Sequence, residues 1–167
     1  MQEIERKYLV RSDDFRREAF ASVRIAQGYL CRRRVTARIR LRGEEAFLTI
    51  KGRSRDGGVS RFEWERRIPA AVAERLLARC DGRIEKVRHM VLFGETLFEV
   101  DEFAGDNAGL IVAEAELPTT DTRPQLPPWI WKEVTGNPFY YNSFLVKHPY
   151  CEWGPSLPND KSQPVQR

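Results

Sequence analysis

Charged residues recur two positions apart along this sequence, and most of these groups carry one sign. Successive side chains of a β-strand point to opposite faces, so residues i and i+2 share a face. Like charges side by side on one face repel each other unless something of opposite sign lies between them. Six segments show this pattern: Glu3/Glu5/Lys7, Arg38/Arg40/Arg42, Glu63/Glu65/Arg67, Lys86/Arg88, Glu99/Asp101 and Glu114/Glu116.

These two kinds of charge predict two kinds of ligand. Carboxylate oxygens suit a hard divalent cation such as Mg²⁺ or Mn²⁺. Arginine suits phosphate oxygens through its forked guanidinium, and lysine suits them as a point charge. A metal-bound polyphosphate needs both sets at once, because magnesium bridges phosphates with few protein carboxylates while cations hold the other oxygens.

A solvent-facing role is the alternative for any single pair, since antiparallel sheets often have one wet side. In several segments, however, the opposite face is apolar, as at Ile39, Val87 and Val100. Each such strand already has a side to bury. This favours an enclosed space lined by the charged faces.

The elements that must position these residues are mostly strands. Strands are expected at 3–10, 23–30, 37–42, 46–51, 60–68, 83–92, 95–103 and 110–117. Short helices are expected at 14–21, 69–79, 128–134 and 141–146, the second opening after Pro69. Many short strands with few helices predict a mainly β (α+β) fold, an eight-stranded antiparallel closed barrel with a few peripheral helices.

The chain has 167 residues, which is the size of one domain. We expect a single domain over 1–153 and a flexible tail over 154–167, where turn residues gather. Charged residues make up 31% of the chain, above the roughly 25% of an ordinary domain. The net charge of +4 and the run Arg32-Arg33-Arg34 keep nucleic-acid binding open as an alternative.

Other classes of protein are excluded by what the sequence lacks. No apolar run approaches the roughly 20 residues of a membrane helix, so no membrane partner is expected. The first five residues lack the order of a signal peptide. Cys31, Cys80 and Cys151 share no metal-ligand spacing, which argues against a zinc site or disulfide framework. A cytoplasmic protein is expected.

Taken in order, the charged motifs resemble the CYTH superfamily, also called triphosphate tunnel metalloenzymes. The opening Glu3-Ile4-Glu5-Arg6-Lys7 matches its Glu-x-Glu-x-Lys signature. The match continues through Arg38-Ile39-Arg40, Thr49-Ile50-Lys51-Gly52, Glu63-Trp64-Glu65, Lys86-Val87-Arg88, Glu99-Val100-Asp101, Glu114-Ala115-Glu116, Glu133-Val134-Thr135 and Tyr140-Tyr141-Asn142. It spans about residues 1–153 and is most similar to the short bacterial inorganic triphosphatases.

The resemblance implies an eight-stranded tunnel that binds a triphosphate together with Mg²⁺ or Mn²⁺. It assigns metal binding to Glu3, Glu5 and Glu116, with Asp101 and Glu114 nearby. It assigns phosphate binding to Lys7, Arg38, Arg40, Lys51, Lys86 and Arg88.

The resemblance also implies catalytic groups. Glu63 and Glu65 face the tunnel, either at a second metal or orienting the attacking water. Tyr29 partners Lys7 and relays a proton, the alternative being a packing tyrosine on a strand.

The expected activity is metal-dependent hydrolysis of a triphosphate, foremost inorganic tripolyphosphate to diphosphate and phosphate. A class IV adenylyl cyclase or a thiamine or nucleoside triphosphatase is the alternative within the family. A polyphosphate or RNA binding module is the non-enzymatic alternative. The expected partner is a small-molecule triphosphate, with no stable nucleic-acid partner, and the sequence makes no prediction of oligomeric state.

Overall fold

The computed structural model describes residues 2–32, 36–55 and 60–153, without the side chains of residues 2, 3, 31, 32, 54, 55, 60 and 61. The expected tail at 154–167 and residues 33–34 of the arginine run lie outside this description. The described strands are β1 (Gln2–Val10), β2 (Ala21–Arg32), β3 (Thr36–Arg42), β4 (Glu45–Arg55), β5 (Ser60–Ile68), β6 (Arg83–Phe93), β7 (Thr96–Phe103), β8 (Ile111–Glu116) and β9 (Ile130–Glu133). The described helices are α1 (Phe15–Glu18), α2 (Ala70–Leu77) and α3 (Asn142–Leu145), with short 3₁₀ turns η2 (Gly105–Asn107), η3 (Pro138–Tyr140) and η4 (Tyr150–Glu152).

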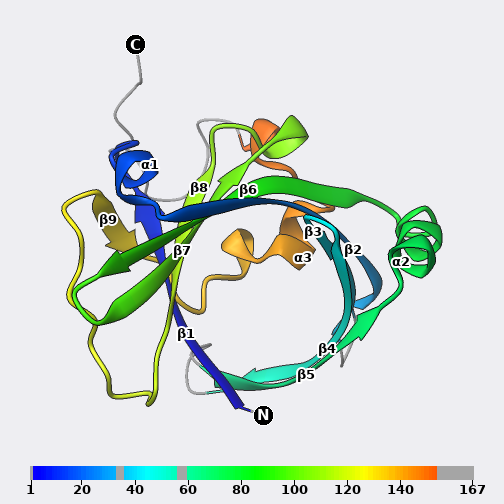
Figure 1. Ribbon diagram of the computed structural model, residues 1–167, viewed down its shortest axis with the longest axis horizontal. Helices are drawn as coiled ribbons and strands as arrows, with labels where there is room; N and C mark the ends of the chain where they lie inside the picture. The colour runs from blue at the N-terminus through cyan, green and yellow to red at the C-terminus, as the bar shows by residue number, and fades with distance from the viewer. Residues whose placement is uncertain (1, 33–35, 56–59, 154–167) are drawn as a thin grey trace.

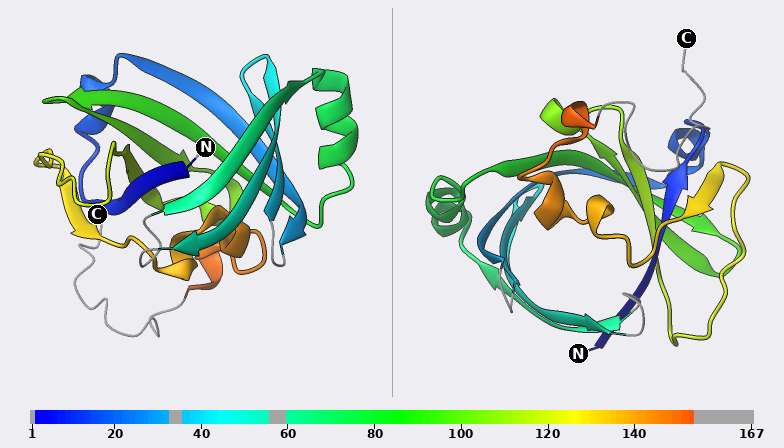
Figure 2. Two further views of the ribbon diagram at one scale, coloured as in Figure 1. Left: turned by 90° about the horizontal axis from the view of Figure 1, so that it is seen from below. Right: turned by 180° about the vertical axis from the view of Figure 1, so that it is seen from behind.

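All strand pairs are antiparallel, and they follow the order β5-β4-β3-β2-β6-β7-β8-β1-β9. The start of β1 also pairs with the start of β5, with Ile4 opposite Ser60, so the ladder of pairs returns to its first strand. Figure 1 looks through the resulting ring, and Figure 2 shows it from below and from behind. The prediction of an eight-stranded antiparallel barrel is confirmed.

The outer face of the ring is apolar where helices α1 and α2 pack against it. Ile39 of β3 is fully buried and packs in one cluster with Ala73 and Leu77 of α2. A second cluster joins Val100 of β7 to Phe15 of α1. Burial of these outer side chains stabilises the barrel and leaves its inner face available for charge.

One end of the inner face is apolar as well. Leu9 and Phe103 have the parity of the inward-facing charges on their strands, and both pack in one buried cluster with Ile84 and Leu145. Leu145 belongs to α3, which lies within the outline of the ring in Figure 1. The barrel therefore has a charged inner wall above an apolar floor.

The helix expected at 128–134 is wrong, because this segment contains strand β9. Tyr8 pairs with Glu133 and Leu9 with Lys132, so β9 extends the sheet beside β1. The neighbouring Trp129 is 1% exposed in the outer core, 5.8 Å edge-to-face from Phe98. Pairing with β1 and burial of the indole decide the conformation here. Among the described residues, no helix has the length and apolar character needed to cross a membrane.

Candidate active site: a charged cavity in the barrel

A cavity of about 670 Å³ lies inside the ring. The carboxylates among its described lining residues are Glu5, Glu63, Glu65, Glu99, Glu114 and Glu116. The cations are Lys7, Arg38, Arg40, Lys51, Arg53 and Arg88. Most of the alternating charges of the sequence thus face one cavity, whereas Arg42 and Arg67 are exposed and pair with Glu45.

The structure brings most of the sequence-predicted site residues to this cavity. Those that line it are Glu5, Lys7, Tyr29, Arg38, Arg40, Lys51, Glu63, Glu65, Arg88, Glu114 and Glu116. Lys86 and Asp101 are buried deeper, 2% and 1% exposed, and connect to the wall through ion pairs. The backbone of Glu3 lies in β1, but its side chain is outside the described part of the structure.

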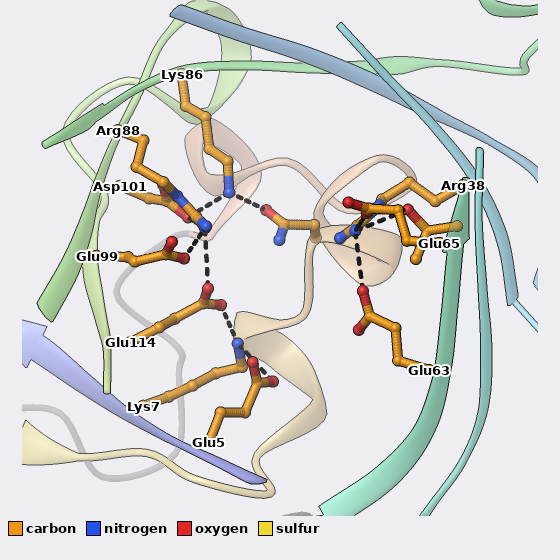
Figure 3. A network of polar contacts seen from close by, with 12 residues as sticks. Glu5, Lys7, Arg38, Glu63, Glu65, Lys86, Arg88, Glu99, Asp101 and Glu114 are labelled. Carbon is orange, nitrogen blue, oxygen red and sulfur yellow. Dashed lines mark hydrogen bonds and ion pairs between the residues drawn. The ribbon is translucent and has the colours of Figure 1, made fainter. Parts of the chain in front are cut away.

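Strand β1 presents Lys7 between two carboxylates. Its Nζ forms ion pairs with Glu114 and, at 3.2 Å, with Glu5 (Figure 3). The backbone N–H of Lys7 donates to Thr135 Oγ1 at 3.0 Å, and its carbonyl accepts from the N–H of Val134 at 2.8 Å. The segment after β9 therefore holds this lysine in place.

Strands β6 and β7 build a buried ion-pair network. Arg88 donates through Nε and Nη2 to both oxygens of Asp101, each at 2.7 Å, and Lys86 pairs with the same carboxylate. Burial opposes ionisation of Asp101, but the charges of Arg88 and Lys86 outweigh it and hold the pKa of Asp101 below its ordinary value. Arg88 extends the network to Glu99 and, at 2.9 Å, to Glu114.

Two further pKa shifts follow from the same burial. Burial lowers the pKa of Lys86 from 10.5 to about 8, and the charge of Asp101 offsets this only in part. Burial also opposes ionisation of Glu114, yet Lys7 and Arg88 hold the pKa of its carboxyl well below the usual range. Near neutral pH both groups are therefore charged.

The opposite wall of the cavity comes from β3, β4 and β5. Lys51 forms an ion pair with Glu63. Arg38 lies 3.7 Å from the same carboxylate (Figure 3). Glu65 accepts from Thr49 Oγ1 at 2.7 Å and lies 3.5 Å from Arg38. Both predicted catalytic carboxylates are thus fixed beside cations.

Arg40 differs from the other lining cations. No ion pair or hydrogen bond joins its guanidinium to any part of the chain that the structure describes, and its Nε is buried without a partner. Burial, together with the like charges of Arg38 and Arg88, lowers its pKa to about 10, and the charges of Glu65 and Asp101 offset this only in part. A desolvated guanidinium beside two other cations is suited to bind an anion.

Tyr29 is 6% exposed on the inner face of β2 and lines the cavity. Its hydroxyl accepts a hydrogen bond from Gln27 Nε2 at 2.9 Å. A hydroxyl has one proton to donate and two lone pairs to accept, so a Tyr29 hydroxyl that accepts from Gln27 directs its proton to a different group.

The sequence reasoning assigned no role to several polar residues of this site. Thr49 donates to Glu65, and Gln27 donates to Tyr29. Arg53 lines the cavity, and Asn142 Oδ1 accepts from Lys86 Nζ at 3.5 Å. Gln27 and Thr49 each lie two positions before a predicted site residue, so their parity was a usable signal. Asn142 belongs to a motif of the family match, but that motif did not indicate its contact with Lys86.

The donor set fits a hard divalent cation. Glu5 and Glu116 lie directly opposite each other on β1 and β8, and both line the cavity. No three His, Cys, Asp or Glu side chains form a ready metal cage in the described residues. Magnesium does not require one, because it is usually held by one or two carboxylates with substrate phosphates and water completing its shell.

Fold and site together define a class of protein: an antiparallel barrel whose charges line an internal cavity and whose apolar core lies outside the ring, under α1 and α2. Residues 1–139 match the CYTH domain, and the chain belongs to this family. The resemblance found in the charged motifs is thereby confirmed.

Relatives within this family are named for one activity. The chain is 42% identical over 151 residues to the inorganic triphosphatase of Acetivibrio thermocellus, covering 89% of this chain and 95% of the relative. It is 37% identical over 152 residues to that of Nitrosomonas europaea, covering 87% and 97%. Among solved structures, the inorganic triphosphatase NE1496 superposes with a TM-score of 0.60 at 32% identity, covering 86% of this chain and 93% of that one.

Proposed function

We propose that the protein hydrolyses inorganic tripolyphosphate to diphosphate and phosphate inside this cavity. The observation that carries the proposal is Arg40, a half-buried residue beside Arg38 and Arg88 whose guanidinium forms no ion pair or hydrogen bond within the described residues. An anion with several oxygens satisfies these three cations together. The relatives named inorganic triphosphatase support the same substrate.

The cations serve to bind the chain of phosphates and to stabilise its charge as the reaction proceeds. Arg38, Arg40 and Arg88 offer forked donors, and Lys7 and Lys51 offer point charges from the two sides of the cavity. Lys86 contributes from below, next to the apolar floor. Phosphoryl transfer depends mainly on positioning and electrostatics, so an ordered wall of charges suits it.

In the hydrolytic step a water attacks the terminal phosphorus, the P–O bond to the rest of the chain breaks, and diphosphate leaves. Glu63 or Glu65 orients the water, since both carboxylates are fixed beside cations on one wall. Tyr29, with Lys7, relays a proton between the water and the departing oxygen.

Glu5, Glu114 and Glu116, together with Glu3, would hold Mg²⁺ or Mn²⁺. When bound, the metal neutralises charge on the phosphate oxygens. We assign Asp101 a different task, because it is 1% exposed and is not among the described residues that line the cavity, whereas Glu114 is. It positions Arg88 and Lys86 for phosphate binding.

A phosphate-release panel tests this function. Tripolyphosphate, ATP, GTP and thiamine triphosphate are each assayed with Mg²⁺, Mn²⁺ and Ca²⁺, and after chelation. We expect the highest kcat/KM with tripolyphosphate, activity lost on chelation and restored by Mg²⁺ or Mn²⁺. Glu116→Gln should raise the concentration of Mg²⁺ or Mn²⁺ needed for half-maximal activity. Glu85→Gln, on the exposed side of β6, is the matched control and should leave that concentration unchanged. No phosphate released from any substrate would refute the proposal.

The same panel separates the alternatives. Cyclic AMP formed from ATP identifies a cyclase, and a preference for thiamine triphosphate identifies an organic triphosphatase. A binding module holds polyphosphate or RNA without turnover, and its binding survives Glu5→Gln.

A further inference from the structure

Gln27 is a fully buried amide on the inner face of β2. It is 0% exposed, lies opposite Arg40 on β3 and lies opposite Ile84 on β6. One neighbour belongs to the charged wall and the other to the apolar floor. The amide thus sits where the cavity changes character.

The two polar atoms of the Gln27 side chain differ in their hydrogen bonding. Nε2 donates to the hydroxyl of Tyr29 at 2.9 Å, whereas Oε1 has no partner among the described residues. A buried acceptor without a partner costs about 1–3 kcal/mol. An apolar side chain of similar volume, such as methionine, would fill the site without this cost. Packing alone therefore does not explain a glutamine here.

We propose that Gln27 is a positioning residue for Tyr29, which rests on the proposed triphosphatase function. By donating to the phenol oxygen, Gln27 fixes the direction of the ring hydroxyl and directs its proton away from the amide. Gln27 acts through Tyr29 and touches no substrate.

A double-mutant cycle tests the coupling. Wild type, Gln27→Met, Tyr29→Phe and the double variant are compared for kcat and KM with tripolyphosphate. Gln27→Met should lower kcat about 10-fold with KM within about twofold, a size typical of losing part of an acid–base contribution. In the Tyr29→Phe background the same change should have no further effect. The free energy of unfolding should not fall, because the unpartnered carbonyl is removed.

A further variant, Gln27→Glu, tests the direction of this hydrogen bond. In Gln27→Glu an ionised carboxylate only accepts, so the Tyr29 proton turns toward it and kcat should fall further than in Gln27→Met. Gln125→Met, at an exposed position, is the matched control and should leave kcat unchanged.

A spectroscopic measurement keeps the inference separate from the proposed function. With ¹³C-ring-labelled tyrosine, the Cζ signal of Tyr29 is assigned by its loss in Tyr29→Phe, and it should shift in Gln27→Met but not in Gln125→Met. Independent, multiplicative effects on kcat, an unchanged kcat in either single variant, or an unmoved Cζ signal would each overturn the role of Gln27. A wild type without phosphate release, but with the shifted signal, would instead refute the triphosphatase function alone.

Discussion

Gln27 and Arg40 lie directly opposite each other on β2 and β3, and each keeps one buried polar atom unpartnered within the described residues. The atoms are Oε1 of Gln27 and Nε of Arg40. Native interiors rarely leave such groups unsatisfied, and those that do usually serve a site. This pair marks the part of the barrel where function, and not stability, has determined the side chains.

Arg40→Gln should separate binding from stability. The variant removes one forked phosphate donor, and a charged hydrogen bond of about 1.5–3 kcal/mol corresponds to a rise in KM of about 10- to 100-fold. The free energy of unfolding should stay the same or rise, because the lost guanidinium is desolvated beside Arg38 and Arg88. Steady-state kinetics and urea unfolding measure the two effects.

Arg66→Gln is the control for this change, since Arg66 is exposed on β5. It should alter neither KM nor stability. A clear loss of stability in Arg40→Gln would show that the guanidinium has a structural partner after all.

Asp101→Asn should destabilise the fold, because it leaves Lys86 and Arg88 without the carboxylate that both share. Removing one member of a buried ion pair costs about 3–5 kcal/mol. Glu99→Gln should cost much less, since the Glu99 side chain is 32% exposed. Urea unfolding compares the two variants. Adding Lys86→Met to Asp101→Asn should recover part of the loss, and no recovery would argue against an uncompensated Lys86 charge.

Lys86 should give the enzyme an alkaline limit. Its pKa is lowered to about 8 against an ordinary 10.5, so the folded protein loses this proton first as the pH rises. Above about pH 8 Lys86 loses its positive charge, and KM for tripolyphosphate should rise.

The free energy of unfolding should rise over the same pH range in which substrate binding weakens. Between about pH 8 and 10.5 the unfolded chain binds a proton that the folded protein lacks, so the contribution of Lys86 to stability increases with pH. Lys86→Arg keeps its charge and should flatten the alkaline rise in KM. A rise that persists unchanged in Lys86→Arg would assign it to another group.

Gly28→Ala should disturb the site from outside the barrel. A Cβ at Gly28 would lie 2.8 Å from both Cβ and Sγ of Cys80 and 3.2 Å from Leu77 Cδ2. Such overpacking costs about 1–3 kcal/mol. The strand must shift between Gln27 and Tyr29, so kcat should fall together with the unfolding midpoint.

Cys80→Gly removes both atoms that the new methyl meets, so it should restore much of the stability of Gly28→Ala. Thermal unfolding of the single and double variants measures this. A double variant no more stable than Gly28→Ala would place the strain elsewhere.

Strand parity made most of this fold predictable. Arg38 and Arg40 face inward because Ile39 between them packs against α2, and the sequence shows that alternation directly. The ring order was not accessible in the same way. The β2–β6 pairing skips three intervening strands, β3 to β5, so no local pattern brings these two strands together.

The apolar floor was missed for a related reason. Ile84 shares its parity with Lys86 and Arg88, but a single apolar residue beyond a charged pair does not indicate a closed end. The end is closed only because Leu145 of α3 packs in the same buried cluster as Ile84. The segment expected as a helix forms β9 because one edge of β1 is open to pairing at Tyr8 and Leu9, and no local pattern predicts this.

The equal numbers of opposite charges on the described cavity wall, six of each, make that wall electroneutral as a whole. A neutral enclosure exerts little long-range attraction, so capture of the substrate should vary only weakly with ionic strength. A neutral wall also favours a ligand whose charge is already neutralised by bound counter-ions. We therefore expect a polyanion complexed with divalent cations to bind more tightly than the bare anion.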